Sequence, residues 1–151
     1  MKAHEIMISP VYTVKESDSI RSVIEKFIQY RISGLPVVND NNKIVAYISD
    51  GDIMRYIGKH ENIGFYTFEM MAYIKGDEED FKQRTHRILN INVMMIAQRK
   101  VITVLWDEEI ENIAALLGKK QIKKLPVERD GKLVGIISRG DVIRHSFKEI
   151  L

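Results

Sequence analysis

The chain contains an internal repeat, and this duplication restricts its possible folds more than any other feature of the sequence. Short motifs in the first third return about 90 residues later, in the same order and with one deletion between them. The matched motifs are Thr13-Val14 with Thr103-Val104, Leu35-Pro36-Val37 with Leu125-Pro126-Val127, Ile48-Ser49 with Ile137-Ser138, and Gly51-Asp52 with Gly140-Asp141. Chance does not preserve order and spacing over so many matches, so the chain is built from two copies of one structural unit.

Each copy predicts the element order strand, helix, strand, strand, helix. Short β-branched and apolar runs favour the strands, and apolar residues at a spacing of three and four favour the helix. In the first copy the expected strands are 11–14, 35–38 and 44–48, the helical stripe is Ile20, Val23, Ile24, Phe27 and Ile28, and the closing helix is 50–59. In the second copy the strands are 101–104, 125–127 and 133–137, the stripe is Ile110, Ile113, Ala114 and Leu117, and the closing helix is 139–148.

A unit of this size cannot cover both faces of its own sheet. We therefore expect an α+β fold in which two pseudo-symmetric βαββα repeats pack sheet to sheet. Ser17 and Asp107 are the expected N-caps of the first helix in each copy. The Asp130-Gly131 pair between two strands predicts a type I′ turn, because both central residues of that turn need a positive φ.

Residues 61–90 belong to neither copy. Apolar residues between positions 65 and 74 predict one helix, Gly76 ends it, and Asp77 is the expected cap of a second helix that runs to Leu89. The expected organisation is therefore a first repeat at 1–60, a helical connection at 61–90 and a second repeat at 91–151. We expect the connection to pack against the repeats or a second subunit; the alternative is a functional lid.

Composition removes several classes of protein. The 151 residues include no cysteine, which excludes disulfide scaffolds, thiolate zinc sites and cysteine nucleophiles. The longest apolar stretch, at 101–106, is far too short to cross a bilayer, and the N-terminus has no signal-peptide pattern, so we expect a cytoplasmic protein. The net charge is only +2, and the dense basic spot is limited to Lys119, Lys120, Lys123 and Lys124, which argues against nucleic acid as the partner.

The repeated Ser-x-x-Asp motif precedes the closing helix of each copy, as Ser49-x-x-Asp52 and Ser138-x-x-Asp141. By spacing alone these are capping boxes, in which side-chain oxygens accept bonds from the free N–H groups of the helix start. The same geometry suits a ligand, because a helix N-terminus attracts phosphate and a nearby carboxylate can accept both hydroxyls of a ribose.

The two copies resemble the paired cystathionine β-synthase (CBS) domains, also called a Bateman module. The resemblance rests on "SGLPVV" and "KKLPVE" at the second strand, and on "AYISDGDI" and "GIISRGDV" from the third strand into the closing helix. The first copy departs from the family pattern at one point, where Ala46 replaces a glycine.

This resemblance implies an adenosyl-binding site in each copy, with AMP, ADP, ATP or S-adenosylmethionine as regulatory ligands. It implies that Asp52 and Asp141 hold ribose hydroxyls, that Ser49 and Ser138 face phosphate, and that the segment before each Leu-Pro lines the adenine. The implied adenine residues are Ile32, Ser33, Gly34 and Pro36 in one copy and Ile122, Lys123, Lys124 and Pro126 in the other, with Thr13 and Thr103 nearby. It also implies a homodimer, with a separate protein or the dimer itself as the regulated target.

The two sites are not equivalent in charge. Asp50 follows the serine in the first copy and Arg139 follows it in the second. An acidic group repels phosphate, whereas a guanidinium can hold it with two parallel hydrogen bonds. We therefore expect the site built on Ser138 and Asp141 to be the better phosphate site, although Arg139, Arg144, Arg55 or Arg31 can also reach across to the other ligand.

Catalytic and metal chemistry find little support in the sequence. No nucleophile stands with a matching acid and base, so we expect no enzymatic activity. The four histidines, at positions 4, 60, 86 and 145, lack metal-ligand spacing. The main hypothesis is an adenosyl-ligand sensor. Its rivals are a structural interaction or dimerisation module with empty clefts, a nucleic-acid-binding regulator, and a nucleotide hydrolase.

Overall fold

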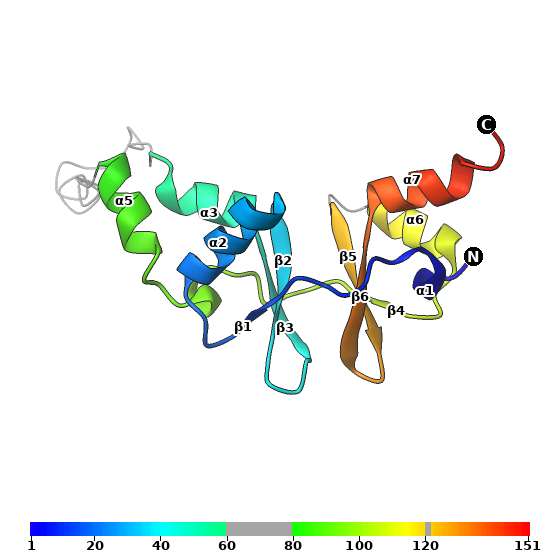
Figure 1. Cartoon of the computed structure of the whole chain (residues 1–151), viewed down its shortest axis with the longest axis horizontal. Coiled ribbons are helices and arrows are strands. Elements are labelled where there is room, and N and C mark those ends of the chain that lie inside the picture. Colours follow the sequence, from blue (N-terminus) through cyan, green and yellow to red (C-terminus); the bar gives the residue numbers. More distant parts are fainter. Residues whose placement is uncertain (60–79, 120–121) are drawn as a thin grey trace, which may run out of the picture.

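A computed structural model describes residues 1–59, 80–119 and 122–151 of the chain, and it contains the two expected repeats (Figure 1). The first repeat comprises β1 (Val14–Lys15), α2 (Ile20–Tyr30), β2 (Gly34–Val38), β3 (Ile44–Ser49) and α3 (Asp50–Ile57). The second repeat comprises β4 (Val104–Leu105), α6 (Ile110–Lys119), β5 (Lys124–Arg129), β6 (Lys132–Ser138) and α7 (Arg139–Phe147). Three further elements are α1 (Ala3–Ile6), α5 (Phe81–Ile88) and the 3₁₀ helix η1 (Val93–Met95).

Each repeat forms a three-stranded sheet, in the orders β1-β2-β3 and β4-β5-β6. The first strand of each sheet runs parallel to the second, and the second and third form an antiparallel hairpin. The two sheets lie next to each other in the middle of the molecule, and the helices lie away from their junction (Figure 1). The hairpin loop of the first repeat reaches the second sheet, because Asn42 and Leu133 exchange two hydrogen bonds of 2.9 and 3.0 Å. The expected α+β pair of βαββα repeats is confirmed.

The first strands are much shorter than predicted. Only Val14 and Lys15 pair with β2, and only Val104 and Leu105 pair with β5. The residues before β4 do not join the sheet, because Val101 and Ile102 instead line a cavity between the repeats.

The predicted N-caps of the first helices are wrong. Helix α2 begins at Ile20 with Ser19 as its N-cap, because the Asp18 carboxylate accepts a bond from the Lys15 N–H and closes a turn that holds residues 15–18 outside the helix. Helix α6 begins at Ile110, three residues after Asp107, because a turn from Leu105 to Glu108 precedes it.

The apolar stripe of α2 is narrower than predicted. Ile20 and Val23 are buried, and Ile24 and Phe27 pack against the same core, but the Ile28 side chain is 75% exposed. The hairpin turn agrees with the prediction, since Asp130 and Gly131 have φ values of 53° and 76°. Both values lie in the left-handed region that a type I′ turn requires.

Each hydrophobic core contains residues that lie outside its own repeat in the sequence. Helix α1 packs into the second repeat, where Ala3 and Ile6 are buried with the β4–β6 residues. Conversely, Ile88 and Val93, which follow the first repeat in sequence, are buried in its core with Ile20 and Val23. The sequence limits of 1–60, 61–90 and 91–151 therefore remain proposed sequence units, and each core draws on residues from outside its own unit.

The connection between the repeats contains a described helix, α5, that contacts α3. Its N-cap is Asp80, whose carboxylate accepts a 2.8 Å bond from the Gln83 N–H, so the predicted cap at Asp77 is wrong and the helix starts later. Asp77 and the helix predicted around 65–74 lie outside the described residues. Within the ranges that the structure describes, no helix has the length and apolar character needed to span a membrane.

A neighbouring side chain explains why the second repeat has a glycine at position 135 where the first repeat has Ala46. In the second repeat, Gly135 lies under Met7, and a Cβ at Gly135 would approach the Met7 sulfur to 2.2 Å. The repeat shift places Ala46 at the position of Gly135 and Ala97 at that of Met7. Ala97 packs against the core that contains Ala46, so a smaller neighbour accompanies the larger residue.

Candidate functional site

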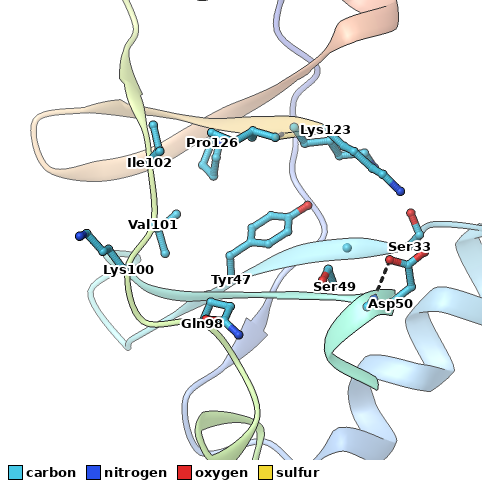
Figure 2. Close-up of a pocket in the computed structure, with 14 residues that line it drawn as sticks. Ser33, Tyr47, Ser49, Asp50, Gln98, Lys100, Val101, Ile102, Lys123 and Pro126 are labelled. Atoms are coloured by element: carbon cyan, nitrogen blue, oxygen red, sulfur yellow. Dashed lines mark hydrogen bonds between the residues drawn. The ribbon is translucent and has the colours of Figure 1, made fainter. Parts of the chain in front are cut away.

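A cavity of about 430 Å³ lies between the two repeats (Figure 2). The first repeat contributes residues from the start of β2, from β3 and from the first turn of α3. The second repeat contributes the segment that leads into β5, and the stretch before β4 closes one side. The lining residues are Ser33, Gly34, Tyr47, Ser49, Asp50, Gly51, Gln98, Lys100, Val101, Ile102, Ile122, Lys123, Lys124 and Pro126.

The start of α3 forms one end of this cavity, and its position is set by backbone hydrogen bonds. The Asp50 N–H donates to the Ser33 carbonyl over 2.7 Å, which ties the helix start to the segment before β2. The Gly51 N–H donates to the Asp50 carboxylate over 2.8 Å. The helix start and the β2 segment therefore form one rigid wall.

Both Ser-x-x-Asp motifs are capping boxes, as their spacing predicted. Asp52 and Asp141 each accept a bond from the serine N–H at the helix start, over 2.9 and 2.8 Å. Each carboxylate is almost completely buried, with 3% of the residue exposed. The capping interpretation is confirmed by these contacts.

The second oxygen of each carboxylate is also occupied. Arg55 forms an ion pair with Asp52, and Arg144 forms one with Asp141 over 2.5 Å. The Gln98 side-chain amide donates a further bond of 3.0 Å to Asp52. A ligand hydroxyl would compete with Arg144 for Asp141, and with Arg55 and the Gln98 amide for Asp52.

Tyr47 projects from β3 into the cavity (Figure 2). Its ring lies over Gly34, where an added Cβ would come within 2.5 Å of the phenol oxygen, so this packing requires glycine. Burial raises the pKa of Tyr47 to about 12, and the negative charge of Asp50 adds to the rise. The phenol is therefore neutral at physiological pH and can donate a hydrogen bond to a ligand.

The structure places Arg139 away from this cavity. Its guanidinium donates a 2.9 Å bond to the Leu117 carbonyl of α6. Arg139 also lines a second, smaller pocket with Leu117, Val142 and Ile143 on the surface of α6 and α7. Its predicted contact with phosphate remains a prediction.

The cavity gathers about half of the residues that the sequence suggested. Those that line it are Ser33, Gly34, Ser49, Ile122, Lys123, Lys124 and Pro126. Those that do not are Thr13, Ile32, Pro36, Asp52, Thr103, Ser138, Arg139 and Asp141. Asp52 still acts at its edge through Gln98.

Sequence reasoning missed several lining residues, chiefly Tyr47, Gln98 and Lys100. Tyr47 alternates with buried residues on β3, a pattern that marks one face of the strand. Gln98 had no comparable signal. Its place depends on a backbone pairing with Tyr47, through two hydrogen bonds of 2.9 Å, that joins segments far apart in the sequence.

The fold and the cavity together define a tandem pair of small α+β domains with a cleft between them. The sequence profile of the CBS domain matches residues 3–59 and 93–148, which covers most of the chain. The chain therefore belongs to the CBS domain family.

Relatives and solved structures agree with this assignment. The chain is 34% identical to MJ1426 of Methanocaldococcus jannaschii, over 95% of its own length and 89% of that protein. It is 28% identical to MJ1225 of the same organism, over 93% of its length but only 41% of that protein. Its fold is similar to that of CBSX2 in complex with AMP, with a TM-score of 0.73, 24% identity and 97% of each chain covered.

Proposed function

We propose that this CBS pair is a regulatory module that binds an adenosyl compound between its repeats and has no catalytic activity of its own. The observation that carries the proposal is the cavity at the repeat junction. Its walls contain the Ser33-Gly34 and Lys123-Lys124 segments that the family resemblance assigns to adenine. A volume of about 430 Å³ lies in the usual range for small-molecule sites.

Adenine nucleotides and S-adenosylmethionine share the part of the ligand that this site would recognise. The apolar wall formed by Val101, Ile102 and Pro126 suits the face of a purine. The solved complex of CBSX2 with AMP supports an adenine nucleotide as one ligand class. AMP, ADP, ATP and S-adenosylmethionine are therefore the compounds to test.

The contacts of the titratable groups support a holding role over a catalytic one. Asp52 and Asp141 are engaged by capping bonds and arginine ion pairs. A general acid or base needs a pKa near the operating pH and access to the reacting atom, and these buried carboxylates have no such access. The output would be a shift between two arrangements of the module, sensed by a separate regulated protein.

Thermal unfolding with a panel of adenosyl compounds tests the proposal. A ligand at about 100 times its Kd stabilises the folded state by about 2.7 kcal/mol, which raises the Tm by roughly 5–11 °C for a chain of this size. The nucleic-acid alternative predicts instead a steeply salt-dependent affinity for RNA or DNA with no preference for adenosine. No shift with any compound would leave the structural module as the better interpretation.

Alanine variants extend this test to the two carboxylates. If the site on Ser138 and Asp141 holds the phosphate, Asp141→Ala should abolish the shift given by AMP while Asp52→Ala retains most of it. Each variant is first compared with the parent protein in the absence of ligand, because loss of the capping box costs about 1 kcal/mol by itself. The reverse pattern would contradict the ranking of the two sites.

We further propose that the module forms a homodimer through its helices. Exposed apolar side chains gather on α7 and the residues that follow, where Ile143, Phe147 and Ile150 are 57%, 46% and 74% exposed. Apolar patches of this kind mark association surfaces. Sedimentation equilibrium should give twice the monomer mass, and Ile143→Glu should return the monomer. A parent protein that is monomeric at high concentration would contradict the proposal.

A further inference from the structure

We infer that the cavity between the repeats selects adenosyl compounds whose 5′ substituent is neutral or positively charged, and that Asp50 is the residue that sets this preference. The inference rests on the proposed function and makes it more specific. It concerns the cavity built on Ser49. Ligands that carry a phosphate would instead bind at the equivalent site on Ser138 and Asp141.

Asp50 places a fixed negative charge in the cavity wall. Its backbone N–H is bonded to the Ser33 carbonyl, and its carboxylate is held by the Gly51 N–H. Figure 2 shows the side chain at the end of the cavity formed by Ser33 and Ser49. Among the residues that the structure describes, no lysine or arginine forms an ion pair with Asp50. A carboxylate without a cationic partner in a ligand cavity favours a cation.

The start of α3 is also less suited to phosphate than the start of α7. A helix N-terminus binds anions through unpaired N–H groups and the positive end of the helix dipole. Here the Gly51 N–H donates to the Asp50 carboxylate, and two acidic side chains, Asp50 and Asp52, lie in the first turn. The equivalent first turn of α7 contains Asp141 as its single acidic residue.

The lysines of the cavity do not cancel this effect at the α3 end. Lys100 and Lys123 are exposed and Lys124 is half-buried, and none of these three lining lysines forms an ion pair with Asp50. Asp50, in contrast, is fixed next to Ser49, the serine that the family resemblance places beside a 5′-phosphate. A phosphate carries close to two negative charges at neutral pH, and like charges placed next to each other repel.

The experiment compares adenosine, S-adenosylmethionine and AMP by titration calorimetry on the full chain and on Asp50→Asn. Crystals soaked with each compound show which cleft it occupies. In the parent protein we expect AMP to bind this cavity at least tenfold more weakly than adenosine or S-adenosylmethionine. Asp50→Asn should remove most of that difference by strengthening AMP, and it should weaken the cationic compound severalfold while adenosine stays within about twofold.

Asp40→Asn is the matched control, because it makes the same change in net charge at a fully exposed turn residue that does not line the cavity. Equal effects of the two substitutions would overturn the inference, as would a parent cavity that binds AMP as tightly as adenosine. Those results would leave the proposed function intact. If none of the three compounds binds anywhere, the inference and the proposed function both fail.

Discussion

Replacing Ile6 by alanine should destabilise the protein by about 2–5 kcal/mol, the usual cost of removing most of a buried isoleucine side chain. Ile6 is 2% exposed and lies in the core of the second repeat, although it lies before β1 in the sequence. The loss should therefore appear in the second repeat. Trp106, the only tryptophan, packs against that core and its ring lies 4.9 Å from that of His4, so its fluorescence reports on this region during urea unfolding.

Ile8→Ala is the matched control for this experiment. Ile8 has the same side chain two residues later, but it is 53% exposed and is held by backbone bonds to Ile136 that alanine would keep. We expect a much smaller loss there, within about 0.5–1 kcal/mol. Equal effects at the two positions would show that α1 does not belong to the core of the second repeat.

Gly135→Ala should destabilise the protein by about 1–3 kcal/mol, the usual cost of overpacking a tight site. The added Cβ would overlap the Met7 side chain, whose three nearest atoms lie between 2.2 and 2.9 Å from it. Urea unfolding of the variant measures the loss. A neutral effect would mean that Met7 moves aside at no cost.

The double variant Met7→Ala/Gly135→Ala tests the cause of this loss. It recreates in the second repeat the pair that the first repeat has in Ala97 and Ala46. Because alanine at position 7 removes the Sδ and Cγ atoms that would lie nearest to the new Cβ, the two changes together should cost at least 1 kcal/mol less than the sum of the separate losses. Additive losses would place the overlap elsewhere.

The repeat made the fold predictable, because the same pattern appears twice and each copy checks the other. The hairpins, the closing helices and the type I′ turn at Asp130-Gly131 follow from local patterns of two to six residues. The residues at which the helices begin were harder to predict from the sequence. Ser17 and Asp107 are good N-cap residues, yet turns that involve Asp18 and Glu108 delay both helices.

The site was predictable to the extent that it lies within the repeated motifs. Ser49 belongs to the repeated Ser-x-x-Asp motif, and the family resemblance implies Ser33 and Gly34; all three line the cavity. Gln98 and Lys100 do not, because their positions depend on how a connecting segment crosses between the repeats. The hydrogen bond from the Gln98 amide to Asp52 joins residues 46 positions apart, and no local sequence pattern indicates it.

The exchange of chain between the cores also limits how this protein can be divided. A fragment that stops at residue 60 would lack Ile88 and Val93, and a fragment that starts at residue 91 would lack Ala3 and Ile6. Neither fragment contains a complete hydrophobic core. Dividing the chain between the two repeats therefore gives fragments that each lack core residues present in the other. The segment near residues 98–102 connects the two repeats and also lines the cavity. A small molecule bound there would therefore contact the segment that joins the two halves.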